Sequence, residues 1–485
     1  MRTLARTAVL LSLAAAPAAG QAPSATPGTV LPRVATAADP AQSYALYLPS
    51  RWEAGRRWPV LVVMDPEGHA GVPMERFRAA AERNGWIVAS SWNTAAETDS
   101  ALALNDRAVD AVVADVIRRY AADSTRLYFA GFSGTARYAW TLPGRLARPV
   151  AGIIGVGAGL PQQSAVVLPR IRETRPFPWF GAAGGTDYNL DEMARLDTSL
   201  VATALPHRFE PFDGGHEWLP AELAGRAMEW MQLQSIALGQ APRDTVWMAT
   251  AYAAGLERCR GMEARGDRYG AWAGYHALVG DYLGLRDVSA AQARGSALAQ
   301  DAAVRRERIR RGEQALEFTQ FRAVIDAVFT ELMISGSGNV ERRLVNLLDL
   351  DKLRRREADA GGSAQSRQMA TRMLNTAFAV GTHEAELSMR NRRYRHAASA
   401  LRIARMARPA GAGVCWPLAR ALAQAHDRDA AIEALGCALQ RDAVTADAAA
   451  REPMLEPLRA DPRFAALLAR PAPPASSGSG SGGMR

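Results

Sequence analysis

Cysteine is scarce in this sequence. Three of the 485 residues are cysteines, Cys259, Cys415 and Cys437, and they form neither a CxxC pair nor a Cys/His spacing typical of a structural metal site. No metal is therefore predicted. We expect the three cysteines to be small buried hydrophobic residues in helices. The alternative is a disulfide between Cys415 and Cys437, which leaves Cys259 free and is compatible with an oxidising compartment.

Lysine is almost absent. Lys352 is the only one, so arginine carries nearly all the basic charge behind the formal net charge of +9. Between residues 23 and 240 acidic residues slightly outnumber basic ones, so the positive excess lies mainly in the C-terminal half. Arginine runs such as 305–311 and 354–356 lie among acidic residues in a helical pattern, and we interpret them as solvated helix faces. No nucleic-acid-binding motif accompanies them, so no nucleic-acid partner is predicted.

Long apolar runs are missing after the first residues. No later stretch is apolar enough to cross a bilayer, so we predict no transmembrane anchor. The start has two arginines, an apolar run over 8–16 and small residues over 17–20, which is the pattern of a secretory signal peptide. We therefore expect residues 1–22 to be a signal peptide and the protein to be exported, to the periplasm or the medium. Residues 23–40, rich in Pro, Ala and Thr, are expected to be a disordered linker.

Residues 41–240 alternate short apolar runs with amphipathic stretches. The predicted strands are 44–48, 60–64, 87–91, 127–130, 150–156, 178–181 and 208–212, and the predicted helices are 75–84, 101–120, 135–142, 191–205 and 221–238. This alternation predicts an α/β domain, a mainly parallel sheet flanked by helices on both faces. Such a sheet binds its ligand at the carboxyl ends of the strands.

Residues 241–470 lack strand patterns and are predicted to be an all-α domain. One repeat is clear at an offset of 34 residues, where Ala397, Leu401 and Ala404 recur as Ala431, Leu435 and Ala438. This is the tetratricopeptide period. Residues 266–275 resemble the hinge between two such helices, and 335–339 predict a helix break. The Pro-rich and then Ser/Gly-rich residues 471–485 are expected to be a flexible tail.

A candidate nucleophile stands at Ser133, in Gly-Phe-Ser-Gly-Thr at 131–135. The motif follows a strand-like segment and precedes a helix-like one. A serine between small residues at such a turn is a nucleophile elbow, since bulky residues two positions away would collide with the flanking strand and helix. Thr135 departs from the pattern because it is β-branched where glycine is usual.

A serine hydroxyl needs an adjacent base to become a good nucleophile. Only two of the seven histidines lie downstream of Ser133 within the sheet region. His207 opens a predicted strand, at the wrong end for catalysis. His216 follows two glycines in the loop after the last predicted strand, and we predict that it is the base. The nearby carboxylates Asp213 and Glu217 are expected to be solvated.

The base needs an acid that orients it, and Asp187 is the candidate. It follows the glycines that end the predicted strand 178–181. Its alternative role is to cap the next helix, which Asp191 can do instead. Glu192 and Asp197 are interpreted as ordinary helix carboxylates.

The negative charge that develops on the substrate oxygen needs two N–H donors. The N–H of Gly134, directly after the nucleophile, is one. The second is predicted in the loop after strand 60–64, where Pro66 has no N–H, which leaves Glu67 or Gly68.

Three segments, 123–134, 184–187 and 214–218, together resemble the α/β-hydrolase superfamily. The likeness is greatest to exported esterases of the polyhydroxybutyrate-depolymerase-like and dienelactone-hydrolase-like branches, and it covers roughly residues 40–240. It implies an α/β-hydrolase fold without a large lid, because no long insertion separates strand 150–156 from strand 178–181. The helical region resembles tetratricopeptide modules by its one repeat.

The resemblance implies that Ser133 is the nucleophile, Asp187 the acid and His216 the base. We predict an exported serine hydrolase that cleaves a small or polymeric carboxylic ester without a cofactor. A peptidase or thioesterase with the same triad is an alternative. Another is a helical-repeat scaffold whose hydrolase part is inactive. The helical half is expected to cover the site, to recruit a polymeric substrate or to bind a protein partner.

Overall fold

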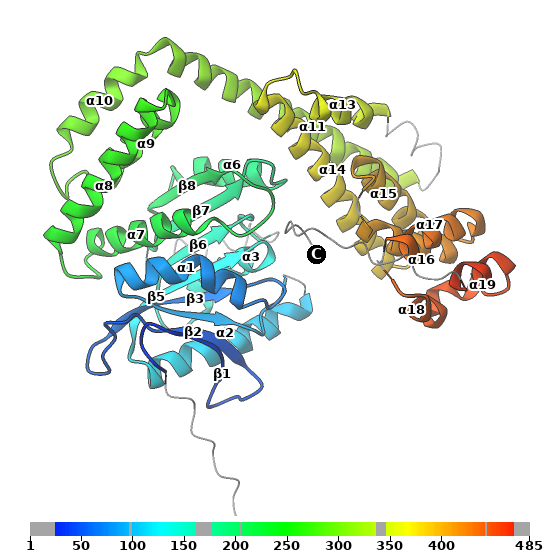
Figure 1. Ribbon diagram of the computed structural model, residues 1–485, viewed down its shortest axis with the longest axis horizontal. Helices are drawn as coiled ribbons and strands as arrows, with labels where there is room; N and C mark the ends of the chain where they lie inside the picture. The colour runs from blue at the N-terminus through cyan, green and yellow to red at the C-terminus, as the bar shows by residue number, and fades with distance from the viewer. Residues whose placement is uncertain are drawn as a thin grey trace, which may run out of the picture.

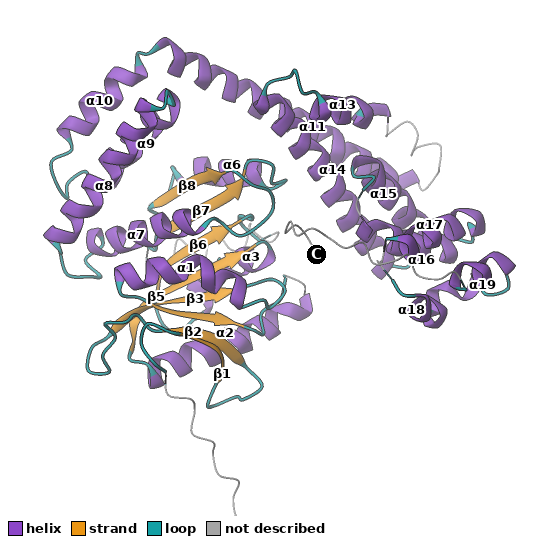
Figure 2. Cartoon of the chain, in the orientation of Figure 1, coloured by secondary structure: helices purple, strands orange, loops and turns teal. Residues whose placement is uncertain are grey.

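The computed structural model describes residues 25–96, 99–161, 176–203, 205–335, 346–410, 412–441 and 444–469. The predicted signal peptide, the predicted tail and residues 336–339 of the predicted break lie outside the described residues. Figure 1 shows a sheet region followed by a helical region that arches over it, and Figure 2 shows that the helical region contains helices and loops.

The sheet region is built on an eight-stranded sheet. Its strands are β1 (Val30–Ala35), β2 (Ser43–Tyr47), β3 (Trp58–Met64), β4 (Ile87–Ser91), β5 (Ala122–Phe132), β6 (Val150–Val156), β7 (Trp179–Gly184) and β8 (His207–Phe212). Their order is β1-β2-β4-β3-β5-β6-β7-β8. The β1–β2 and β2–β4 pairs are antiparallel and all the others are parallel. The predicted fold class, a mainly parallel sheet with helices followed by an all-α region, is confirmed.

Helices cover both faces of this sheet. They are α1 (Gly71–Asn84), α2 (Asp99–Arg119), α3 (Gly134–Ala139), α4 (Leu142–Arg145), α6 (Leu190–Leu200) and α7 (Ala221–Ala237). Strand β3 is buried along its whole length. Its residues Leu61 and Val63 belong to the core under α1 and α7, whereas Val60 and Val62 belong to the core under α2 and α6. This two-sided burial explains why the parallel strands are continuous apolar runs in the sequence.

Strand β1 was not expected, because residues 23–40 were predicted to be a disordered linker. Residues 30–35 instead pair with β2 at the edge of the sheet, and Val34 is buried in the core. Pro32 lies at the point where the register shifts, between Leu31 and Val34. An edge strand tolerates a proline because one side of it needs no N–H donor. Pairing and the burial of Val34 therefore outweigh the unfavourable local composition.

The C-terminal region consists of helices in its described part. They are α8 (Thr245–Ala264), α9 (Arg268–Tyr282), α10 (Ser289–Ala299), α11 (Ala302–Ser335), α13 (Leu350–Ala358), α14 (Ala364–Arg390), α15 (Tyr394–Ala407), α16 (Cys415–Gln424), α17 (Arg428–Gln440), α18 (Ala446–Arg451) and α19 (Pro462–Leu468), with short 3₁₀ helices η1 (Ala412–Val414) and η2 (Pro453–Leu458).

A similar turn joins the two helices in three pairs of this region: α8 and α9, α14 and α15, and α16 and α17. Gly266, Arg392 and His426 each adopt a positive φ between two helices, and each is followed by the residue that precedes the next helix. A turn over 265–267 therefore lies between α8 and α9, whereas the rest of the predicted hinge 266–275 belongs to α9. The repeated Ala and Leu positions are all buried on α15 and α17. The likeness of the whole region to tetratricopeptide modules stays a prediction.

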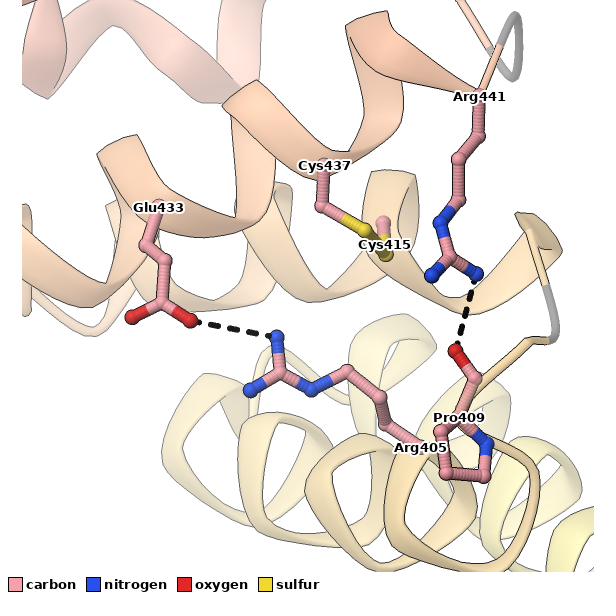
Figure 3. Close-up of a disulfide and its surroundings, with 6 residues drawn as sticks. All are labelled: Arg405, Pro409, Cys415, Glu433, Cys437 and Arg441. Atoms are coloured by element: carbon pink, nitrogen blue, oxygen red, sulfur yellow. Dashed lines mark hydrogen bonds and ion pairs between the residues drawn. A yellow bond between two sulfur atoms is a disulfide. The ribbon is translucent and has the colours of Figure 1, made fainter.

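A disulfide joins Cys415 at the start of α16 to Cys437 on α17 (Figure 3). The antiparallel packing of the two helices brings their Cα atoms to 5.8 Å, within the range of a disulfide. The expectation that all three cysteines are unpaired is wrong for these two, whereas Cys259 is free and buried as expected. Arg441 on the turn after α17 also donates to the Pro409 carbonyl at 2.9 Å.

Candidate active site

Ser133 lies at the sharp turn between β5 and α3, with φ 51° and ψ −123°. This strained conformation is the one that an elbow requires. A Cβ on Gly131 would come within 2.4 Å of the Thr135 carbonyl oxygen, so the turn leaves no room for a side chain there. The fold, with its elbow at the carboxyl end of a central strand, is that of the α/β-hydrolases.

Thr135, the residue that departs from the usual motif, stabilises the turn. Its hydroxyl accepts the Phe132 N–H at 3.0 Å and donates to the Met64 carbonyl at 2.6 Å. Because Met64 ends β3, this hydroxyl ties the elbow to the neighbouring strand. The buried threonine is therefore fully hydrogen-bonded, and its β-branched side chain is compatible with the elbow.

The sheet brings Ser133, His216 and Asp187 together from the carboxyl ends of β5, β8 and β7. The Nε2 atom of His216 lies 2.9 Å from Ser133 Oγ. Its Nδ1 atom lies 3.0 Å from each carboxylate oxygen of Asp187. The Asp187 side chain is fully buried and that of His216 is 16% exposed. A serine hydroxyl, an imidazole and a carboxylate are thus within hydrogen-bonding reach of one another, as the predicted roles of these residues require.

Two aromatic rings enclose the His216 imidazole. Its centroid lies 4.7 Å from the ring of Phe132 and 4.4 Å from that of Tyr188. Burial, and next the charge of Asp187, raise the pKa of Tyr188, so its hydroxyl keeps its proton near neutral pH. Sequence reasoning missed Tyr188, although its position directly after the candidate acid was a signal that could have found it.

Asp187 also organises the start of α6. It accepts the Asn189 N–H at 2.8 Å, and the Asn189 side chain donates to the Gly157 carbonyl at 2.7 Å. The helix begins at Leu190 with Asn189 in the capping position. The expectation that Asp191 caps this helix is wrong, because Asp191 lies inside its first turn and pairs with Arg195.

The loop after β3 differs from the expectation for the second oxyanion donor. The Glu67 N–H donates to Asp65 Oδ1 at 2.9 Å, and the Gly68 N–H donates to the Asp65 carbonyl at 3.2 Å. Asp65 thus engages both N–H groups in this conformation. Gly134 is the first residue of α3, where an N–H has no partner within its own helix. It is the predicted donor that the geometry leaves available.

The remaining candidates lie apart from this cluster. His207 begins β8, 4.0 Å from Asp197, at the amino end of the strand. Asp213 and Glu217 are exposed, as expected. Glu192 is not an ordinary helix carboxylate, because it pairs with Arg137 and accepts the Gly159 N–H at 2.9 Å.

No group of His, Cys, Asp and Glu side chains in the described ranges has the arrangement of a metal site. None of the helices in those ranges has the length and apolar character that a membrane span requires.

No family model matches the chain, and no curated protein matches it. Solved structures to which it is similar include S-formylglutathione hydrolase (FrmB) from Staphylococcus aureus, at 14% identity and TM-score 0.34, over 39% of this chain and 90% of that one. Another is FphF, a fluorophosphonate-binding serine hydrolase of Staphylococcus aureus, at 12% identity and TM-score 0.35, over 42% and 98%. An esterase from the archaeon Pyrobaculum calidifontis has 14% identity and TM-score 0.33, over 43% and 87%.

Proposed function

We propose that the protein is an exported serine hydrolase that cleaves a carboxylic ester through Ser133, His216 and Asp187. The observation that carries the proposal is the position of the His216 imidazole, within 3.0 Å of both the Ser133 hydroxyl and the Asp187 carboxylate. The sequence pattern alone also predicts these three residues. Their hydrogen bonds are those that acyl transfer to a serine requires.

In the proposed reaction Ser133 Oγ attacks the ester carbonyl carbon while His216 Nε2 takes the hydroxyl proton. The tetrahedral intermediate collapses, the ester C–O bond breaks, and the same Nε2 returns the proton to the leaving alkoxide. Water then attacks the acyl-enzyme with His216 again as base, releasing the acid and restoring Ser133. Asp187 accepts from Nδ1 throughout, which holds the reactive tautomer and stabilises the imidazolium.

The surroundings support these roles. Phe132 and Tyr188 pack against the His216 ring and restrict its rotation. The imidazole therefore stays oriented with one nitrogen toward Ser133 and the other toward Asp187. Gly134 is the first residue of α3 and directly follows Ser133, so its N–H can donate to the developing oxyanion. We favour an ester over an amide because an alkoxide is a better leaving group than an amide anion. The contacts of the described residues also leave one predicted oxyanion donor, the Gly134 N–H, to assist departure.

Two observations support export. The first residues have the signal-peptide pattern. The Cys415–Cys437 disulfide is a bond that persists in oxidising compartments. Detection of the mature protein in the periplasm or medium, with residues 1–22 removed, would test this part.

A fluorophosphonate probe tests the proposed chemistry. We expect the wild type to be labelled and Ser133→Ala to be unlabelled, with the same thermal unfolding temperature. Ser289→Ala, which changes an exposed serine at the start of α10, is the matched control and should label like the wild type. A folded wild type that stays unlabelled contradicts the proposal and favours an inactive hydrolase platform. A panel of p-nitrophenyl esters, thioesters and peptide amides then identifies the acyl donor.

A further inference from the structure

Helix α14 of the helical region touches the loop that carries Asp187. Asn375 Nδ2 donates to the Thr186 carbonyl at 2.9 Å, across 189 residues of sequence. Two turns earlier on the same helix face, the Gln368 amide lies so close to Gly185 that a side chain there would overlap it. In Figure 2 the arrowheads of the parallel strands point toward the side on which α14 lies. The helical region therefore reaches the candidate active site itself.

Thr186 connects this helix to both loops of the triad. Its N–H and its hydroxyl each lie 3.0 Å from the Gly214 carbonyl, in the loop that carries His216. Its own carbonyl accepts from Asn375. The next N–H, that of Asp187, donates to the Gly184 carbonyl at 3.0 Å. The peptide group between Thr186 and Asp187 is therefore held at both ends, by α14 on one side and by the end of β7 on the other.

Arg408 sets the direction in which Asn375 points. Its Nε and Nη2 atoms donate to Asn375 Oδ1 at 2.9 and 2.7 Å. A guanidinium has only donors, so the amide oxygen must face Arg408 and the amide NH₂ must face Thr186. Nη1 of the same arginine pairs with Glu357 at 2.8 and 2.9 Å. Residues from α13 and α14 thus converge on the arginine that follows α15.

A second contact anchors the helical region elsewhere on the sheet region. Asp281 on α9 pairs with Arg208 of β8 at 2.7 Å and accepts from the Trp230 indole of α7 at 2.8 Å. In Figure 1, α10 and α11 form an arch between α9 and α14. Attachment at two separate places holds α14 against the Asp187 loop.

We propose that the helical region belongs to the catalytic apparatus, with Asn375, oriented by Arg408, as a positioning residue for Asp187. This inference rests on the proposed function and assigns part of the helical half a role in it. Among the described residues, Asn375 hydrogen-bonds to Thr186 and Arg408 and to neither Ser133 nor His216, so it acts through the Thr186–Asp187 peptide. Because small displacements of catalytic groups are costly, we expect its loss to lower kcat by about 10-fold.

Two substitutions of Asn375 distinguish a role in positioning Asp187 from a contribution to the stability of the fold. Asn375→Asp keeps an acceptor for Arg408 but removes the N–H donor and turns a negative oxygen toward the Thr186 carbonyl. Asn375→Ala removes the contacts to both Thr186 and Arg408. If the carboxylate of Asn375→Asp prevents folding, the alanine variant provides the test of the positioning role. The control is Asn391→Asp, the same change at the exposed end of the same helix. On p-nitrophenyl acetate we expect kcat to fall about 10-fold in both Asn375 variants, with KM within about 2-fold, and no change in the control.

A double-mutant cycle with Asp187→Asn identifies the route of the effect. If Asn375 positions Asp187, adding Asn375→Asp to Asp187→Asn lowers the residual rate by less than about 2-fold, because residues that act as a unit are not additive. The same 10-fold loss in both backgrounds overturns the inference, and so do Asn375 variants with the wild-type kcat. An inactive wild type instead overturns the proposed function, so the two failures are distinguishable.

Discussion

The sheet region and the helical region differ in how they place chemically important residues. In the sheet region Ser133, Asp187 and His216 each follow the end of a parallel strand, and the sheet gathers such ends at one edge. In the helical region Asn375 lies in the middle of α14, where no motif marks it. In a parallel sheet, a residue that follows a strand in the sequence therefore lies near the site. A residue within a helix reaches the site only if the helix packs against it.

The two regions also differ in packing. Strand β3 buries large apolar side chains on both faces. The pair α15 and α17 buries alanines such as Ala397, Ala404 and Ala431, which let helices approach closely but remove less apolar surface from water. At about 25 cal/mol per Å² this is a smaller gain per residue. The disulfide lies in this alanine-rich part and adds a covalent link between two of its helices.

The largest expected effect tests the sheet region. Asp187→Asn removes the charge that stabilises the His216 imidazolium, while the amide oxygen can still accept the Asn189 N–H. We expect kcat for a small ester to fall by about 10³-fold to 10⁴-fold with the fold retained. Asp213→Asn, an exposed carboxylate in the His216 loop, is the control and should change kcat less than about 2-fold. Equal losses in the two variants would refute the assignment of the acid.

The next effect tests the helical region. Cys415→Ser with Cys437→Ser removes the cross-link between residues 22 apart in sequence. We expect the free energy of unfolding of this part to fall by about 3 kcal/mol, measured by urea denaturation followed by circular dichroism. Because the disulfide lies on α16 and α17, kcat should stay near the wild-type value. A parallel fall in kcat would show that the end of the helical region also supports the site.

Cys259 tests whether the first helices of the helical region exclude water. Burial raises the pKa of this thiol from 9.0 to about 11. At pH 8 it should therefore react with a disulfide reagent about 100-fold more slowly than an exposed thiol introduced by Ser289→Cys. Since the native state keeps its proton while the unfolded chain loses it, stability should fall as the pH rises from about 9 to 11. Equal rates for the two thiols would mean that this core opens readily.

The smallest effect distinguishes backbone strain at a glycine from steric contact of an added side chain with the triad residues. Gly157 and Gly239 both adopt positive φ, at 65° and 68°. A Cβ on Gly157 would lie 3.1 Å from both Asp187 Oδ2 and His216 Cε1, whereas one on Gly239 meets nothing within 4 Å. Alanine at either position should cost about 1 kcal/mol of stability. Only Gly157→Ala should lower kcat, by about 10-fold, and equal kinetics would show that the triad tolerates the added methyl.

Local patterns account for what the sequence predicted well. Seven of the strands were anticipated from apolar runs, because burial on both faces is visible in composition. The elbow at Ser133 was anticipated because small residues are required at a strained turn. Two of the errors have one cause in common, since each depends on a partner distant in sequence. Strand β1 forms by pairing with β2, and the two cysteines pair across a helix hairpin.

By itself the sequence determined the order of strands β2 to β8 with the main helices between them, the serine turn, and Asp187 and His216 as candidate acid and base. These depend on backbone conformation and on periodic burial, which act over a few residues. Only the tertiary structure decided that His216 lies between Ser133 and Asp187, that Tyr188 stacks on it and that Asn375 reaches the Asp187 loop. Such contacts form between distant segments, so they depend on how the whole chain packs.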